Sequence, residues 1–343
     1  MIPSTTHGYR QPGYALTIDG RDITPRLNGR LISLSLTDAR DGHADQLTLT
    51  LSDHDHRTPL PTNGKTLSLA LGWAPRLIDK GEFIINEVEI TGPPSTVHIR
   101  ARAVDTTRSL PGQRTASWHH TTLGEIVETI AARHSLTAAI AKDLHAVRVA
   151  HIDQTSESDL NFLHRLGQHY DAIASIKAGR LLFIPRGQST TASGKSLPVI
   201  TLSPHDGDHY RYVRSLTDSY SGVRAHYNDR SGGRLHYVIA GDGSDFQNVR
   251  ELKATYATEE DATHAAEAEW ARIKRGMAEF HFSLAQGRAD IGVESPVRLA
   301  GFRGEMEKEQ WVATEVAHRL DERGFRTEVR CEPALDLLSL DDK

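Results

Sequence analysis

Short runs in which apolar and polar residues alternate dominate this chain, and the last of them, Trp311–Glu332, shows the pattern most clearly. A period of two is what a β-strand needs when one face is buried and the other is wet. A similar unit stands earlier, at Phe83–Arg102, and when the two are aligned Glu87-Val88 falls on Glu315-Val316. A turn containing glycine follows in both. The similarity of these two units predicts a duplicated β domain, although chance alternation could give the same match.

Residues 13–105 read as the first β domain, after a polar arm over residues 1–12. Six or seven short strands are separated by turn signals, which is typical of a small antiparallel barrel or sandwich. Asp19-Gly20 is a dipeptide favoured in tight type I′ hairpins. The apolar positions that define the strands are Leu16, Ile18, Ile32, Leu34, Leu36, Leu47, Leu49, Leu51, Leu67, Leu69 and Leu71.

The period changes to a helical one in residues 106–186, which we expect to form a mixed α/β middle domain. Thr122 and Glu125 fit a capping box at the start of one helix. A second helix is predicted to begin near Ser156, and Ala172–Ile184 reads as a hairpin. The Ser-, Thr- and Gly-rich residues 187–198 are the best linker candidate.

The β pattern returns over residues 199–332, which we assign to a second tube-like barrel, and residues 333–343 form a tail. Within it, Thr258–Asp261 opens an Ala-rich helix that extends to about residue 276. We expect this helix to pack over its own barrel; binding a partner helix is a compatible alternative. The fold class predicted for the whole chain is therefore α+β and β-rich, with two tube-like antiparallel β-barrel domains around a mixed α/β middle domain.

Composition narrows the class of protein. The chain has 343 residues, a net charge of −5 and 25% charged residues, an ordinary globular balance that lacks the basic face of a general nucleic-acid binder. Its single cysteine, Cys331, excludes an internal disulfide and a cysteine-based zinc site. No apolar run approaches a membrane span, and no signal-peptide pattern opens the chain, so we expect a protein folded in a cytosol.

Three groups of histidines and acids are candidate chemical sites. They are Asp53–His56, His119-His120, and His205 and His209 with Asp206 and Asp208. Each lies in a polar loop or before a helix cap, whereas metal ligands need fixed spacing on rigid elements. No zinc-protease, serine-hydrolase, Walker A or dinucleotide motif occurs with the right flanks. We therefore predict no enzymatic activity, no metal and no cofactor.

The order of several motifs resembles the phage late control protein D family, the baseplate hub proteins of contractile tails, which are related to the N-terminal part of type VI secretion VgrG spikes. The resemblance covers nearly the whole chain. It rests on Leu16–Gly20, Gly81–Val88, Gly92-Pro93-Pro94, Gln154–Leu163 with Arg165-Leu166, Arg180–Phe183, Gly301-Phe302-Arg303, Trp311, Val316–Leu320 and Gly324-Phe325.

The resemblance implies a homotrimer in which each subunit contributes two tube-like barrels, so that three subunits form a pseudo-sixfold ring. Such a ring would join the sixfold tail tube to a threefold spike, here a separate polypeptide, and the middle domain would project from it. The implied partners are further copies of the chain, the spike, tube or tube-initiator proteins and other baseplate proteins. DNA could pass through the channel without specific binding, and no stable membrane insertion is expected. The implied location is the virion or a phage-tail-like particle, assembled in the bacterial cytoplasm.

Two alternatives remain open. One is the hub part of a type VI VgrG-like spike with a separately encoded tip; the other is a cell-wall hydrolase of the baseplate that uses the loop Asp53–His56. Seven residues are the candidates for structural or interface roles: Phe83, Glu87, Asp159, Phe162, Trp311, His318 and Phe325.

Overall fold

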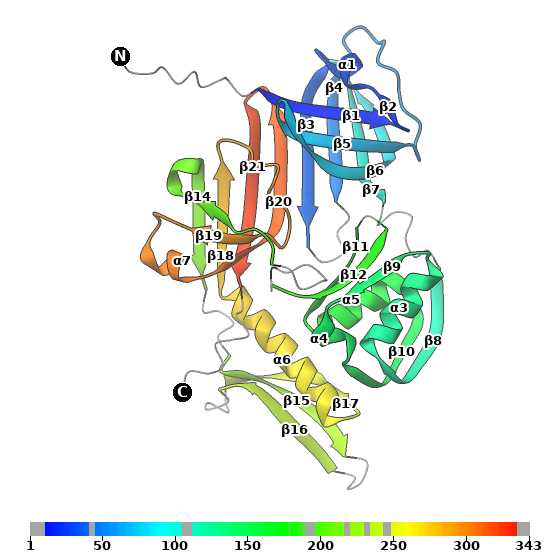
Figure 1. Ribbon diagram of the computed structural model, residues 1–343, viewed down its shortest axis with the longest axis vertical. Helices are drawn as coiled ribbons and strands as arrows, with labels where there is room; N and C mark the ends of the chain where they lie inside the picture. The colour runs from blue at the N-terminus through cyan, green and yellow to red at the C-terminus, as the bar shows by residue number, and fades with distance from the viewer. Residues whose placement is uncertain are drawn as a thin grey trace.

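The computed structural model describes residues 11–40, 45–104, 112–177, 179–187, 189, 196–215, 220–229, 234–242 and 248–334. Most of the predicted arm, linker and tail lies outside these residues. One large sheet, three small sheets and a few helices make the chain β-rich, as the sequence predicts (Figure 1).

The first β unit contains seven strands, within the number that the alternation predicts. Its alternating leucines face one side and are buried, because each strand turns every second residue inward. Asp19 and Gly20 have φ values of 46° and 77°, as a type I′ turn requires. The elements are β1 (Pro12–Ile18), β2 (Arg21–Asp22), α1 (Thr24–Leu27), β3 (Leu31–Ala39), β4 (Gln46–Ser52), β5 (Thr66–Trp73), β6 (Arg76–Thr91) and β7 (Thr96–Ala103).

The middle domain has the predicted mixture of helices and strands around its own core. The capping box at Thr122 and Glu125 is present. The second helix begins later than predicted, because Ser158 and not Ser156 accepts the hydrogen bond from the Asn161 N–H. The elements are β8 (Gln113–Thr122), α3 (Leu123–Arg133), β9 (Thr137–Ile140), α4 (Lys142–His145), β10 (Arg148–Ser158), α5 (Asp159–His169), β11 (Ala172–Lys177) and β12 (Arg180–Pro185).

The second β unit has an aromatic core in which Phe280, Phe282 and Trp311 are buried. Cys331 is buried beside them, as its place in an alternating strand predicts. The elements are β13 (Ile200–Leu202), the 3-10 turn η1 (Pro204–Asp206), β14 (Gly207–Arg214), β18 (Ala278–Leu284), β19 (Pro296–Leu299), α7 (Gly304–Lys308), β20 (Trp311–Asp321) and β21 (Gly324–Pro333).

An inserted subdomain interrupts the second β unit between β14 and β18, and this corrects the assignment of these residues to the barrel. Strands β15 (Gly222–Asp229), β16 (Arg234–Gly241) and β17 (Val249–Tyr256) form a separate sheet. Helix α6 (Glu259–Gly276) packs on that sheet and not over the barrel, because its buried alanines and Ile273 share a core with Val223 and Ala225. Figure 1 shows α6 lying along this sheet at the bottom of the view.

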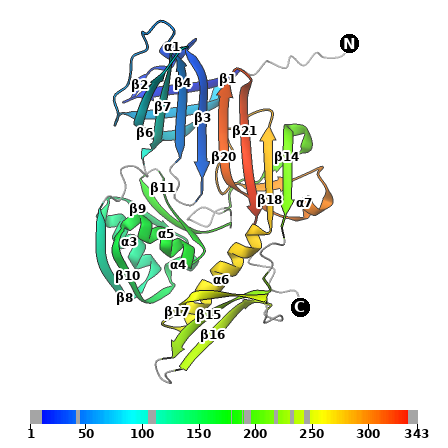
Figure 2. The same cartoon turned by 180° about the vertical axis from the view of Figure 1, so that it is seen from behind.

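The two β units share one continuous sheet, which the sequence did not predict. The strand order β14-β18-β21-β20-β3-β4-β7-β6 runs through both, and β20 of one unit pairs with β3 of the other (Figure 2). If the four strands of each half are numbered along the chain, they lie side by side in the sheet in the order first, second, fourth, third. Because all neighbours are antiparallel, β6 and β20 run in the same direction. One half therefore repeats the other by translation along the sheet.

The hairpins β6–β7 and β20–β21 agree residue by residue. Glu87 lies opposite Arg100 and Glu315 lies opposite Arg330, immediately after an irregularity in each ladder. Both pairs are ion pairs, with distances of 2.5 Å and 3.1 Å between their closest atoms. Equal bulges and equal pairs are hard to obtain by chance alternation, since a bulge resets the register of everything after it.

Candidate assembly surface

The seam between β3 and β20 joins the two β units through their backbones. Their register runs from Glu315 opposite Ala39 to Leu320 opposite Leu34, and the Arg40 N–H donates to the Thr314 carbonyl at 3.0 Å. Side chains add to this contact beside the strands: the Trp73 indole N–H donates to the Gly287 carbonyl at 2.7 Å. The two units are thus fixed to each other as one wall.

A buried ionic cluster closes one end of the seam, and we call Arg40, Asp171, Arg186, Arg275, Glu294 and Glu332 the junction cluster. Arg40 lies 2.5 Å from Glu294 and also binds Glu332. Arg275 forms two bonds with Asp171 and lies 3.4 Å from Glu332.

Each part of the chain contributes to the junction cluster. Arg40 follows β3, Glu332 lies on β21, Arg275 lies on α6, and Asp171 and Arg186 flank strands of the middle domain. The side chains of Arg40 and Arg275 are each only 4% exposed. Three positive and three negative groups balance, which a buried cluster needs because an unpaired charge is expensive.

Two carboxylates of the junction cluster stand on left-handed backbone, with φ of 48° at Asp171 and 66° at Glu294. For a residue other than glycine this costs about 1 kcal/mol or more. The first unit has Gly64 at the position of Glu294: the Gly64 N–H donates to Ile85 as the Glu294 N–H donates to Ala313. Glutamate is therefore explained at 294 by its pairing with Arg40 and not by the turn.

The face of the shared sheet opposite the two cores is polar, and we call it the polar face. It carries charges of both signs that are largely paired: Arg330 contacts Glu279 and Glu315, and Arg319 contacts Glu328. Arginines and carboxylates both contribute to this face. By register they are Glu87, Glu89, Arg100, Arg102, Arg211, Glu279, Glu315, Arg319, Asp321, Arg326, Glu328 and Arg330.

Two strand edges end the eight-stranded run, and among the described residues neither is paired on its outer side. One is β14; the other is the second half of β6, from Glu87 to Thr91, beyond its pairing with β5. Each edge carries a large apolar side chain in solvent: Tyr210 is 44% exposed and Ile90 is 55% exposed. Unpaired edges of this kind invite another strand.

Asp159 organises the middle domain at the start of α5. Its carboxylate accepts from Gln154 at 2.8 Å and lies 2.8 Å from His134 and 3.3 Å from Arg133. Burial acts to raise the pKa of Asp159, but these hydrogen bonds and the Arg133 charge outweigh it, and the pKa is lowered. The charged aspartate therefore ties the end of α3 to the start of α5.

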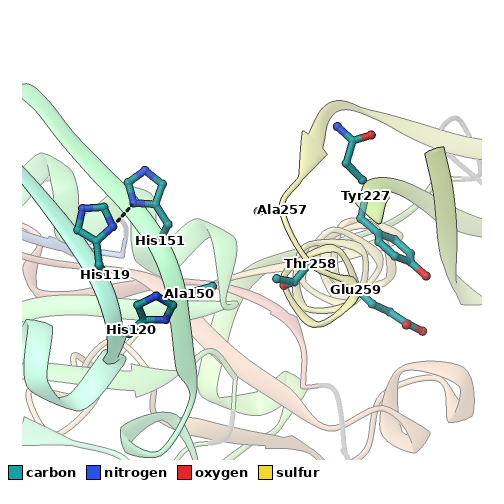
Figure 3. Close-up of a pocket in the computed structure, with 9 residues that line it drawn as sticks. His119, His120, Ala150, His151, Tyr227, Ala257, Thr258 and Glu259 are labelled. Atoms are coloured by element: carbon teal, nitrogen blue, oxygen red, sulfur yellow. Dashed lines mark hydrogen bonds between the residues drawn. The ribbon is translucent and has the colours of Figure 1, made fainter. Parts of the chain in front are cut away.

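A pocket of about 620 Å³ separates the middle domain from the insert (Figure 3). His119 and His151 stack on one wall with their Nδ1 atoms 3.0 Å apart, and Thr258 and Glu259 of the α6 start lie on the other. The predicted pair His119-His120 thus lines this pocket. Within the described ranges, no three His, Cys, Asp or Glu side chains gather as metal ligands would.

The loop Asp53–His56 is held by structural contacts. Asp53 accepts from the Thr58 N–H at 3.0 Å, and Asp55 binds Arg30 through both carboxylate oxygens. His56 is 77% exposed. Both carboxylates are thus engaged in holding the loop.

Comparison with known proteins identifies the family. Residues 46–324 match the sequence profile described as phage tail baseplate hub (GPD). The chain belongs to this baseplate hub family. It is 38% identical to the probable baseplate hub protein of Escherichia phage P2, over 94% of each chain. It is also 38% identical to that of phage 186, over 94% of this chain and 93% of the other.

Solved structures agree in fold at low identity. A tail protein of Neisseria meningitidis has a TM-score of 0.71 at 10% identity, over 94% of this chain and 96% of that one. The Escherichia coli type VI secretion protein c3393 has a TM-score of 0.57 at 13% identity, over 94% and 77%. The predicted resemblance to the baseplate hub family is confirmed, and the chain is a structural hub protein of a phage tail or tail-like particle.

The hub's seven candidate residues lie in three places. Glu87 is half-buried on the polar face, where it pairs with Arg100. Asp159 and Phe162 lie in the middle domain, and Phe162 stacks on Trp118. Phe83, Trp311, His318 and Phe325 are at most 1% exposed and fill the two β units. Their burial makes them core residues of the subunit; roles in assembly stay predictions.

Sequence reasoning missed the junction cluster. Its members are single charged residues at strand and helix ends, and Arg40 and Glu332 are 292 positions apart. No local period marks such residues. The sequence offers only a weak signal for Arg40 and Glu332: each is a charged residue at the end of a strongly alternating strand, and neither interrupts the apolar positions of that strand.

Removing Arg40 should destabilise the hub strongly, because buried Glu294 would lose its arginine partner and Glu332 would keep only Arg275. We expect Arg40→Ala to lower the free energy of unfolding by about 3–5 kcal/mol, measured by urea unfolding. The matched control is Arg30→Ala, which removes a more exposed pair with Asp55 and should cost about 1 kcal/mol or less. Equal losses in the two variants would contradict a buried junction.

His318 should make stability depend on pH. Burial, with Lys80 donating to Nε2 at 3.0 Å, lowers its pKa to about 3. Between the unfolded pKa near 6.5 and this value, only the unfolded chain binds the proton, so stability falls as pH falls. From pH 7 to pH 5 His318 should account for a loss of about 2 kcal/mol, so the total loss should be smaller by that amount in His318→Gln and unchanged in His54→Gln. Burial also lowers the pKa of His169, to about 4, and its share of the loss should remain in both variants. Parallel pH profiles for the hub and its His318→Gln variant would contradict this.

Proposed function

We propose that the hub works as a homotrimeric adaptor of pseudo-sixfold symmetry, joining the sixfold tail tube to a threefold spike. The observation that carries this proposal is the repeated four-strand order within one chain, which supports a duplication of the two β units. Three chains would supply six equivalent units. A sixfold tube could then meet six similar surfaces while the spike meets three identical ones.

The two free edges support ring closure. They differ from one another, so a contact between them is heterologous, and heterologous contacts close into rings when the rotation allows it. The β14 edge of one subunit would pair with the β6 edge of the next, as β3 pairs with β20 inside the chain. The middle domain and the insert, which lie outside the repeat, would project from this ring.

The polar face would line the channel. Its arginines are largely held by neighbouring carboxylates, so a duplex passing along it would meet little net positive potential. We infer that DNA can pass without specific binding. The proposed partners of the ring are the spike protein, tube or tube-initiator proteins and other baseplate proteins.

We place the hub in the virion or tail-like particle after assembly in the bacterial cytoplasm, with a structural and not an enzymatic role. In the part of the chain that the structure describes, no helix is both long and apolar enough to cross a membrane. The likeness in fold to a type VI secretion component supports one alternative, a hub with a separately encoded tip. Genes for phage tail proteins beside the hub gene would favour the phage role over it.

Light scattering tests the proposed stoichiometry. The purified hub should have the mass of a trimer, or should form one when its spike protein is added, because two complementary edges per chain allow a closed ring. A hub that stays monomeric with tube and spike proteins present would contradict the adaptor.

The channel role predicts a gain of DNA binding when the lining loses its carboxylates. The triple change of Glu279, Glu315 and Glu328 to Gln would release Arg319 and Arg330, and the variant should bind duplex DNA at about 0.15 M salt with an affinity that falls steeply as salt rises. The unaltered hub should not bind. The control changes exposed Glu305, Glu307 and Glu309 to Gln, with the same change in net charge. Fluorescence anisotropy with labelled duplex measures both; equal binding by the two variants would contradict the proposed lining.

A further inference from the structure

We infer the residue register of the contact between neighbouring subunits: Glu89 of one copy lies opposite Val213 of the next, and Ile90 lies opposite Tyr212. The inference rests on the proposed ring, and its partner is a second copy of this chain. The internal seam between β3 and β20 is the template. Translation of one half of the sheet onto the other carries β20 onto β6 and β3 onto β14, which are the two strands that meet between chains.

The first step equates β6 with β20. Ile85 and Ala313 each make two backbone bonds with the segment before their hairpin: the Ile85 N–H donates to Lys65 and the Ala313 N–H donates to Ser295. The irregularity that follows leaves Glu87 equivalent to Glu315. Counting on, Glu89 corresponds to Ala317.

The second step equates β3 with β14 through the strands between. Arg100 pairs with Thr48, which pairs with Ser35. In the second unit Arg330 pairs with His281, which pairs with Arg211. Ser35 therefore corresponds to Arg211. By the same count Thr37 corresponds to Val213, and Leu36 to Tyr212.

Combining the steps gives the register. Inside the chain Ala317 lies opposite Thr37 and His318 lies opposite Leu36. The equivalent pairs between chains are Glu89 with Val213 and Ile90 with Tyr212.

The chemistry of the two edges fits this register. Ile90 and the β14 tyrosines lie on the core side of their strands, where Tyr212 already packs edge-on against Trp311 with ring centroids 6.1 Å apart. Pairing would cover the exposed faces of Ile90 and Tyr210. On the polar side, Glu89 would lie diagonal to Arg211, so opposite charges meet.

The seam between chains differs from the internal one at its end. The position of Glu294 is taken by Gly64, and that of Glu332 by Arg102, so two carboxylates of the junction cluster have no counterpart there. The contact between subunits therefore depends on backbone pairing and on Ile90 with the tyrosines. It can form and separate while the internal seam stays locked.

Cysteine pairs test the register, and buried Cys331 leaves little background. In the internal seam the Arg40 N–H donates to the Thr314 carbonyl, so Arg40 and Thr314 form a hydrogen-bonded pair. Hydrogen-bonded and non-hydrogen-bonded pairs alternate, which makes Glu315–Ala39 and Ala317–Thr37 non-hydrogen-bonded pairs. Glu89–Val213, the equivalent of Ala317–Thr37, should therefore have Cα atoms about 4.5 Å apart. We expect the double variant Glu89→Cys, Val213→Cys to give a covalent trimer on non-reducing gels after mild oxidation.

Two shifted pairs serve as controls: Glu87→Cys with Val213→Cys, and Thr91→Cys with Val213→Cys. Both keep the same face but move the register by two residues. Trimers by light scattering that cross-link best through a shifted pair would overturn the register and leave the adaptor intact. A chain that is monomeric in solution and in particle extracts would overturn the ring and the register together.

A side-chain variant tests the apolar contact separately. Ile90→Lys should raise the dissociation constant of the trimer at least about tenfold per seam, since one buried aliphatic side chain is lost from each. The matched control is Ile78→Lys on the other half of β6, where Ile78 is 40% exposed and away from the free edge. Equal trimer stability in the two variants would overturn the assignment of Ile90 to the seam.

Discussion

Backbone pairing between β3 and β20 is the contact on which the rest of the hub depends. It turns two β units that are far apart in sequence into one wall with a single core side and a single polar side. All neighbouring strands in the eight-stranded run are antiparallel, and each unit contributes four of them. Equivalent strands of the two units therefore run in the same direction. It also determines which strands remain as edges.

The junction cluster fixes this wall relative to the middle domain and the insert. Burying charged groups is rarely a net source of stability, and here two members also bear strained backbone. The cluster instead fixes an arrangement: four parts of the chain meet there, and separating them would leave buried charges without partners. The rigid internal seam contrasts with an edge contact that relies on Ile90 and tyrosine side chains.

The sequence predicted most of the secondary structure because its leucines alternate so regularly in the first unit and because Thr122 and Thr258 cap their helices in the ordinary way. It predicted that Glu87 and Glu315 occupy equivalent positions in their hairpins. It did not predict the shared sheet, since strand partners distant in the chain leave no mark on local periodicity. The insert was misassigned for the same reason: β15 and β16 alternate like barrel strands, and only their pairing places them in another sheet.

A density map of the assembled baseplate would test the central claim most directly. At a resolution that separates strands, it should show three hub chains presenting six four-stranded units in one closed sheet, with the polar face towards the axis. A ring in which six chains each contribute one unit, or three chains whose strands do not pair with their neighbours, would contradict it.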